Sequence, residues 1–287
     1  MSAAFCYKTG EMTMKIGMIQ MSSGMDKQAN LRRAAECVKQ CAGQGTQMVV
    51  LPEIFNSPYS NDYFADYAEP CGGESWQALS HMASENAVWL VGGSIPERDG
   101  QGKIYNTSFV FDDRGSQKAR HRKMHLFDID VKDGQKFKES DTFTAGDEIT
   151  VFDSPWGKIG LCICFDFRFP ELARLMVLEG ARAIIVPAAF NMTTGPAHWE
   201  LMFRQRAVDG QCFTVGVAPA RDEQGVYVSY GNSMAVSPWG KVLCRAGAEE
   251  WIHVETLDLE EVDAVRQQLP LLSARRTDLY RLEKLEK

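Results

Sequence analysis

The chain has 287 residues, 45% of them hydrophobic, which is enough to bury a large core in one or two domains. Its 31 basic and 38 acidic residues give a net charge of −7, which excludes the strongly basic surface typical of nucleic-acid-binding proteins. No apolar run reaches the length of about 18 residues that a membrane-spanning helix needs, so no membrane partner is expected.

The N-terminal segment lacks the apolar stretch of a signal peptide. We expect residues 1–13 to form an extension and residues 14–287 to form a single domain. Eight cysteines in a long chain without a signal peptide predict reduced thiols and a cytoplasmic location. There is no CxxC pair, and His121 and His125 have no cysteine pair nearby, so no structural zinc site is expected.

The hydrophobic pattern alternates between strands and helices from the start of the domain. Residues 15–21 predict a strand, and residues 26–42 predict a helix with Asp26 as its N-cap. Cys37 and Cys41 lie four residues apart on this helix. We interpret them as residues that pack the helix against a sheet.

Further strand-like runs follow along the chain, and some of them form hairpins. SPWGK occurs at residues 154–158 and again at 237–241, which predicts two similar hairpin turns. Helices are predicted at residues 170–178, where a proline suits the first turn, and near 198–208; residues 259–287 predict a helix and a charged tail. This alternation predicts one α/β domain whose sheets are covered by helices. The strand-like runs cover residues 47–53, 88–97, 105–113 (a hairpin with the preceding run), 148–165 (two strands), 183–190, 212–220, 232–244 and 251–259.

Two cysteines stand close together in GLCICFDFRFPELARL, residues 160–175. On one strand Cys162 and Cys164 would point to the same face, so alternation cannot choose between them. Cys164 is nearer the carboxyl end, where reactive groups of α/β folds collect and where a following helix lowers the pKa of a thiol. We therefore predict Cys164 as a nucleophile and Cys162 as a packing residue. A disulfide between the two is disfavoured, because their Cβ atoms would lie about 6–7 Å apart.

A nucleophilic thiol needs a base and a group that stabilises an oxyanion. Glu53 ends the apolar run of LPEIF, and a carboxylate there is either paired or raised in pKa. Lys123 in HRKMHLFD and Glu139 in FKES are polar groups of mixed loops. Taken singly, each of these three residues is better interpreted as structural.

Together, LPEIF, HRKMHLF and GLCICFDFRFPEL resemble the motifs of the nitrilase superfamily of carbon–nitrogen hydrolases, over about residues 15–280. The resemblance implies a four-layer α-β-β-α sandwich of the nitrilase type, usually paired as a homodimer. It implies catalytic roles for Glu53, Lys123 and Cys164, with Glu139 as a second glutamate. Phe165 replaces the commoner tyrosine, and its backbone N–H would stabilise the oxyanion together with Lys123.

The segment PAAFNMTTGPAHWELMFRQRAVD, residues 187–209, resembles the ω-amidase branch of this superfamily. The resemblance implies release of ammonia from the terminal amide of short dicarboxylic acid monoamides, such as 2-oxoglutaramate and succinamate, through a Cys164 acyl-thioester. No metal or organic cofactor is implied. Arg168 would bind the free carboxylate of the substrate, unless it pairs with Glu171 or Asp166, while Phe190 and Thr194 match pocket positions.

Other interpretations of the same residues remain open. An amidase of this superfamily acting on deaminated glutathione, or on another small peptide-like amide, is the alternative within enzymes. N-carbamoyl and nitrile hydrolysis fit less well. A catalytically inactive binding or scaffold protein is the alternative of a different class. An activated Cys164 should react quickly with alkylating agents near neutral pH, whereas an inert core thiol should not. His198 and Trp199 are read as structural residues.

Overall fold

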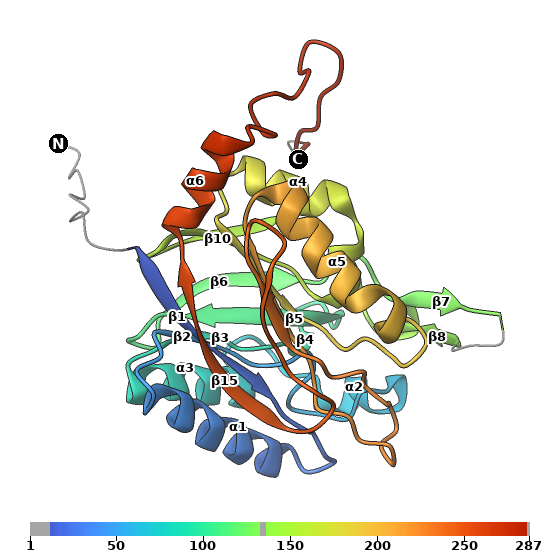
Figure 1. Cartoon of the computed structure of the whole chain (residues 1–287). Helices are drawn as coiled ribbons and strands as arrows, with labels where there is room; N and C mark the ends of the chain where they lie inside the picture. Colours follow the sequence, from blue (N-terminus) through green and yellow to red (C-terminus); the bar gives the residue numbers. More distant parts are fainter. Residues whose placement is uncertain (1–11, 133–135, 286–287) are drawn as a thin grey trace.

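Two β-sheets stack face to face in the computed structural model, with helices on both outer faces (Figure 1). The structure describes residues 12–132 and 136–285. The predicted extension, residues 1–13, therefore lies almost wholly outside the described residues, although Thr13 already pairs with Asp258 in the first sheet. Within the described ranges no helix is long and apolar enough to span a bilayer.

The first sheet has the strand order β15-β1-β2-β3-β5-β4, with β6 added beside β5. Strands β1, β2 and β3 run parallel, while β15 and β5 are antiparallel to their neighbours. The strands are β1 (Thr13–Gln20), β2 (Met48–Val50), β3 (Trp89–Val91), β4 (Ile95–Arg98), β5 (Ile104–Phe111), β6 (Gln117–Arg122) and β15 (Trp251–Asp258).

The second sheet has the order β14-β13-β12-β11-β10-β9, and its central strands β10, β11 and β12 run parallel. A separate two-stranded ribbon is formed by β7 and β8. The strands are β7 (Asp128–Asp130), β8 (Lys136–Lys138), β9 (Thr150–Ser154), β10 (Gly157–Leu161), β11 (Ala183–Pro187), β12 (Phe213–Val217), β13 (Met234–Val236) and β14 (Val242–Arg245).

Helices complete the outer layers. Apolar residues of α1 and α3 pack on the first sheet, and those of α4 and α5 pack on the second. The result is the four-layer α-β-β-α sandwich, so this prediction is confirmed (Figure 1). The helices are α1 (Lys27–Ala42), α2 (Asn61–Tyr67), α3 (Glu74–Asn86), α4 (Pro170–Leu178), α5 (Gly195–Gly210) and α6 (Glu260–Gln268), with 3-10 turns η1 (Glu139–Asp141) and η2 (Cys164–Arg168).

Most buried apolar residues of the described chain form three packed layers, one between the sheets and one under each helix pair, and a smaller fourth cluster contains Ile54 and Tyr59. In β1, Ile16 and Met18 point between the sheets, while Gly17 faces α1. A Cβ on Gly17 would lie only 2.9 Å from the sulfur of Cys41, so the helix approaches the strand closely there. Cys37 and Cys41 are buried free thiols, which confirms their interpretation as packing residues.

Several local predictions can be checked directly. The side chain of Asp26 accepts from the N–H of Ala29 and caps α1, as expected. Both SPWGK segments are turns that connect antiparallel strands, β9 with β10 and β13 with β14. The single strand predicted at 88–97 is wrong, because the chain leaves β3 at Gly92 and starts β4 only at Ile95.

Candidate active site

Glu53 lies on the loop after β2, and the interruption between β3 and β4 holds that loop in place. A Cβ on Gly93 would lie 2.1 Å from the carbonyl oxygen of Pro52, and φ at Gly93 is +56°, so only glycine fits there. Ser94 Oγ accepts from the N–H of Ile54 at 3.0 Å. The glycine-containing segment thus fixes the backbone on both sides of Glu53.

The carboxylate of Glu53 is fully buried and accepts hydrogen bonds on both oxygens. Oε1 accepts from Lys123 Nζ at 2.9 Å, from Asn106 Nδ2 at 2.9 Å and from the Tyr59 hydroxyl at 3.2 Å. Oε2 accepts from the N–H of Ala189 at 2.7 Å. Since Ala189 follows β11 of the second sheet, Glu53 connects the two sheets.

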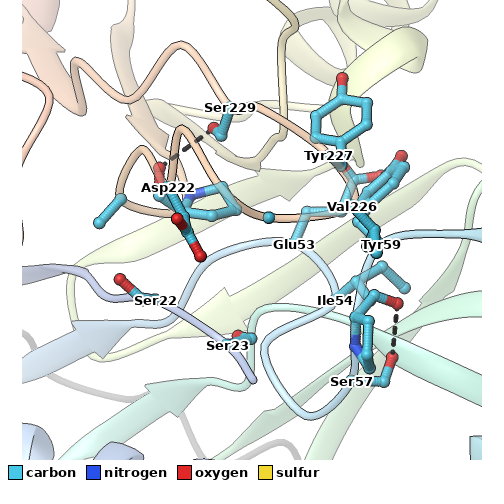
Figure 2. A pocket seen from close by; sticks show the side chains of 14 residues that line it. Ser22, Ser23, Glu53, Ile54, Ser57, Tyr59, Asp222, Val226, Tyr227 and Ser229 are labelled. Atoms are coloured by element: carbon cyan, nitrogen blue, oxygen red, sulfur yellow. Dashed lines mark hydrogen bonds between the residues drawn. The ribbon is translucent and has the colours of Figure 1, made fainter. Parts of the chain in front are cut away.

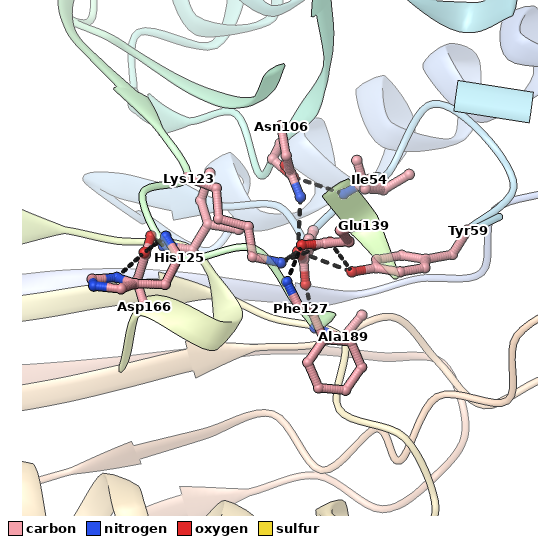
Figure 3. Close-up of polar contacts among 12 residues, drawn as sticks. Ile54, Tyr59, Asn106, Lys123, His125, Phe127, Glu139, Asp166 and Ala189 are labelled. Carbon is pink, nitrogen blue, oxygen red and sulfur yellow. Dashed lines mark hydrogen bonds and ion pairs between the residues drawn. The ribbon is translucent and has the colours of Figure 1, made fainter. Parts of the chain in front are cut away.

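Lys123 follows β6 directly, and its ammonium lies between two carboxylates (Figure 3). Besides Glu53, it donates to Oε1 of Glu139 at 2.8 Å. Glu139 also accepts from the Tyr59 hydroxyl at 2.9 Å and from the N–H of Phe127 at 2.7 Å. The structure therefore brings together three residues that lie far apart in the sequence and that the motifs predicted to meet.

The electrostatics of this cluster follow from its burial. Burial acts to lower the pKa of Lys123, but the carboxylates of Glu139 and Glu53 outweigh it and raise the pKa above its ordinary value. Burial raises the pKa of Glu139, against the attraction of Lys123. The lysine thus stays protonated at neutral pH.

Cys164 does not lie on a strand. Strand β10 ends at Leu161, and Cys164 is the first residue of η2, so the prediction that both cysteines point to one face of a strand is wrong. Its φ is +47°, in the left-handed region, which costs about 1–3 kcal/mol for a residue with a side chain. The surrounding structure holds a strained turn at this thiol.

The thiol of Cys164 is buried beside the charged cluster. Burial raises its pKa well above the ordinary value, and Glu53 raises it further, while Lys123 and the N–H of Ala189 act in the opposite direction. The prediction that a following helix keeps this thiol acidic is therefore wrong, since α4 begins only at Pro170 and burial dominates. The resting sulfur is a neutral thiol that needs a base.

Cys162 has a different environment. It is buried in the apolar layer under α4 and α5, as its interpretation as a packing residue requires. Burial raises the pKa of its thiol, and the carboxylate of Asp166 raises it further.

Arg168, at the end of η2, is a half-buried cation beside the cysteine turn. Its guanidinium carbon lies 4.6 Å from the ring centre of Phe190, and Nη1 donates to Nδ1 of His198 at 3.1 Å. Among the described residues no ion pair joins Arg168 to Glu171 or Asp166, so the salt-bridge interpretation is wrong. Burial lowers the pKa of Arg168, because no carboxylate offsets the loss of solvation.

The remaining predicted residues lie close to Arg168 or to Cys164. Phe165 follows Cys164, and its ring centre is 5.7 Å from the Arg168 guanidinium. The Thr194 hydroxyl donates to Oδ1 of Asn191 at 3.0 Å, so binding a carboxylate through its proton would require this bond to break. Trp199 is buried and donates to the carbonyl of Asn232, in agreement with its structural interpretation.

A small cavity adjoins the Glu53 loop (Figure 2). Its polar lining comes from serines, from Asp222 and from Glu53 itself, while Tyr59 and Tyr227 close one side. Among the described residues that line it there is no lysine or arginine. A carboxylate in this cavity would therefore have no cationic partner among its described lining residues.

Sequence reasoning missed three residues of the site. Tyr59 donates to both glutamates, and Asn106 donates to Glu53. The Tyr227 hydroxyl donates to the carbonyl of Ala189 at 2.6 Å, and its ring centre lies 4.5 Å from that of Tyr59. Asn106 could have been found as the amide of a strand whose other residues are apolar, aromatic or hydroxyl-bearing, whereas the two tyrosines stand in loops without a distinguishing pattern.

One group of potential metal ligands occurs among the described residues, outside this cluster. Cys244, His253 and Glu255 place one ligand atom each within 4.8 Å of one another. Cys244 lies on β14 and the other two on β15, the edge strands of the two sheets. The four residues predicted to be catalytic do not belong to this group.

Comparisons with known proteins agree with this geometry. Residues 15–267 match the family model for carbon–nitrogen hydrolases. Omega-amidase NIT2 of Mus musculus is 49% identical over 94% of this chain and 98% of its own length, and that of Homo sapiens is 47% identical over 94% and 97%. The crystal structure of Saccharomyces cerevisiae Nit3, a member of branch 10 of the nitrilase superfamily, superimposes with a TM-score of 0.86. It is 42% identical and covers 94% of this chain and all of its own.

Proposed function

The chain belongs to the carbon–nitrogen hydrolases of the nitrilase superfamily and is an amidohydrolase, and from this premise we propose its substrate and mechanism. It releases ammonia from the terminal amide of short dicarboxylic acid monoamides, such as 2-oxoglutaramate and succinamate, through an acyl-thioester on Cys164. The omega-amidase name of its relatives supports this substrate class.

The observation that carries the mechanism is the position of Cys164. Its thiol is neutral, strained into a turn, and close enough to Glu53, Lys123 and Glu139 for all three charges to affect its pKa. Such a thiol becomes a nucleophile only when a neighbouring base removes its proton during attack. Glu53 is that base in our proposal.

Acylation then proceeds with a balanced transfer of one proton. The sulfur of Cys164 forms a bond to the amide carbon while Glu53 takes the thiol proton. The Lys123 ammonium and the N–H of Phe165 stabilise the oxyanion, and one such donor contributes about 3–4 kcal/mol. The C–N bond breaks as Glu53 returns the proton to the leaving nitrogen, which departs as ammonia.

Deacylation repeats these roles with water. Glu53 takes a proton from a water molecule while the oxygen of that water attacks the thioester carbon. The C–S bond then breaks as the sulfur regains a proton. The product is a dicarboxylic acid. Glu139 and Tyr59 hold Lys123 and Glu53 in place throughout, through the hydrogen bonds of their buried network. No step needs a metal or an organic cofactor.

Arg168 provides the selectivity for a substrate with a second carboxylate. Its half-buried guanidinium has no acidic partner among the described residues. The carboxylate of a substrate would therefore stabilise a charge that has lost part of its contact with water. The ring of Phe190 beneath it forms an apolar wall for the short carbon chain of the substrate.

The test of this proposal is ammonia release by purified protein. Wild type and Cys162→Ala should release ammonia from succinamate and 2-oxoglutaramate, whereas Cys164→Ala should not. Butyramide, which lacks the second carboxylate, should be a poor substrate. Faster hydrolysis of deaminated glutathione, or a wild type that is inactive on both acids, would overturn the substrate proposal.

We also propose that the protein is a cytoplasmic homodimer. Leu201 on α5 and Trp239 in the β13–β14 turn are large apolar side chains that are 64% and 60% exposed, and they line one groove with Val208. A second copy that covers this groove would bury them. Light scattering should give twice the chain mass for wild type and a single chain mass for Trp239→Arg. The free described cysteines fit a reducing compartment.

A further inference from the structure

Asp166 is a fully buried carboxylate that binds two separate segments of the chain. Its Oδ2 accepts from the N–H of Ile163 at 3.1 Å and from Nε2 of His121 at 2.9 Å. Its Oδ1 accepts from the N–H groups of Met124 and His125, at 3.1 and 2.8 Å, and from Nδ1 of His125 at 2.8 Å. Figure 3 shows Asp166 and His125 side by side, next to Lys123.

These two segments carry the reacting groups. Ile163 directly precedes Cys164, and Met124 directly follows Lys123. Both segments lie just beyond the ends of their strands, because β10 ends at Leu161 and β6 ends at Arg122. Sheet hydrogen bonds therefore do not set their separation, whereas the Asp166 carboxylate spans it.

Lys123 is tied to the first sheet independently of Asp166. Its N–H donates to the carbonyl of Asn106 at 2.8 Å, and its own carbonyl accepts from the N–H of Gly146 at 2.8 Å. Cys164, by contrast, follows a strand of the second sheet. The carboxylate thus bridges a segment anchored on one sheet and a segment anchored on the other.

The bridge requires a carboxylate. Both oxygens face backbone N–H groups, so an asparagine in this position would bring its NH₂ group against a donor whichever way it turned. Burial alone would raise the pKa of Asp166, but hydrogen bonds from His121 and His125 lower it below its ordinary value. The group is therefore ionised at neutral pH, as an acceptor-only bridge must be.

We propose that Asp166 is a positioning residue that fixes the Lys123 ammonium relative to the Cys164 thiol. This inference rests on the proposed function, since it assigns a role to the same site. Asp166 does not touch the substrate in this scheme. A displacement of about 1 Å between reacting groups costs on the order of 10²-fold in rate, which sets the size of the expected effect.

The first test compares Asp166→Asn with Glu69→Gln. Glu69 is another buried carboxylate that accepts a backbone N–H, from Ser75 at 2.9 Å, but it lies outside the site. Acrylamide is the probe, because it is a small primary amide to which a thiol adds, and mass spectrometry measures its addition to Cys164. Asp166→Asn should lower both this rate and kcat for succinamate about 100-fold, with KM within about threefold. Glu69→Gln should change none of these.

A double-mutant cycle with Lys123→Met separates positioning from a general structural role. If Asp166 acts by placing Lys123, then Asp166→Asn should slow labelling less than about threefold in the Lys123→Met protein. A full 100-fold loss in that background would overturn the proposal, as would a folded Asp166→Asn protein with wild-type labelling and kcat.

A second variant and the choice of probe cover an unfolded Asp166→Asn protein and an inactive wild type. Should Asp166→Asn fail to fold, His125→Ala removes one donor to the same carboxylate and should slow labelling about tenfold; an unchanged rate would contradict the bridge. Labelling by acrylamide needs no amide hydrolysis. An inactive wild type would therefore refute the proposed substrate while the comparison of labelling rates still tested Asp166.

Discussion

Two cations of the site, Lys123 and Arg168, are held in opposite ways. Lys123 is completely buried between two carboxylates, at 2.9 and 2.8 Å, and its pKa is raised. Arg168 is half-buried against Phe190 and His198 without an acidic partner, and its pKa is lowered. The charge of Lys123 is compensated within the protein, whereas that of Arg168 is available to a ligand. The comparison supports the proposed roles of Lys123 in the chemical step and of Arg168 in substrate selection.

The largest effect should come from the base in the compensated cluster. Glu53→Gln keeps the shape of the side chain but removes the group that takes the thiol proton, so kcat should fall about 10³-fold or more. KM for succinamate should change little, because Glu53 does not contact the carboxylate end of the substrate. Steady-state ammonia release measures both constants. A loss in kcat below tenfold would show that another group is the base.

Lys123→Met should lower kcat about 10²–10³-fold and leave two buried carboxylates without their cation. Removing one partner of a buried pair costs about 3–5 kcal/mol of unfolding free energy. This loss of unfolding free energy should depend on pH. The pKa of Glu139 is already raised in the folded protein and rises further without Lys123, so the native state binds protons more tightly than the unfolded state.

For a carboxyl with a raised pKa, stability is greatest at low pH and declines as pH rises from the unfolded pKa through the folded pKa. The unfolding free energy of Lys123→Met, relative to wild type, should therefore fall from about pH 4 upward. Urea unfolding across this range measures it. If the difference in unfolding free energy between wild type and Lys123→Met grows smaller as pH rises, the carboxylates are not the origin of the lost stability.

Replacing Arg168, the cation without an acidic partner among the described residues, should change KM and not kcat. Arg168→Met should raise KM for succinamate about 10–100-fold, since hydrogen bonds to a charged group contribute about 1.5–3 kcal/mol. Its kcat should remain within a few-fold of wild type. Butyramide provides the matched control, because its KM should not respond to Arg168. An equal rise in KM for both amides would show that Arg168 does not select the substrate.

The smallest effect is expected away from both cations. Cys162→Ala removes one buried sulfur from the apolar layer under α4 and α5, which should cost about 1 kcal/mol of stability. Its kcat and KM should equal those of wild type. Thermal unfolding and ammonia release check the two statements, and a loss of kcat above tenfold would reopen the choice of nucleophile.

Local signals allowed much of the fold to be predicted. The Asp26 cap, the proline at the start of α4 and the two SPWGK turns are short-range features, and the structure contains them all. Strand β6 was missed because its residues are mostly polar, so its place depends on pairing with β5. Helices α2 and α3, within residues 61–86, were also missed.

For the site, the motifs identified residues that the structure brings together, but not their environment. The pKa of the Cys164 thiol depends on burial by both sheets, which no stretch of sequence contains. The same holds for Tyr59 and Tyr227, whose rings meet only in the folded chain. The left-handed backbone at Cys164 breaks the alternation from which its orientation was predicted.

The most direct test of the central claim is to observe the covalent intermediate. Wild-type protein turning over succinamate is quenched in acid, digested and analysed by mass spectrometry. The account predicts a succinyl group on Cys164 that is absent from Cys164→Ala and forms far more slowly in Glu53→Gln, which lacks the base for acylation. Turnover with a succinyl group on another residue, or with undiminished ammonia release in Cys164→Ala, would contradict it.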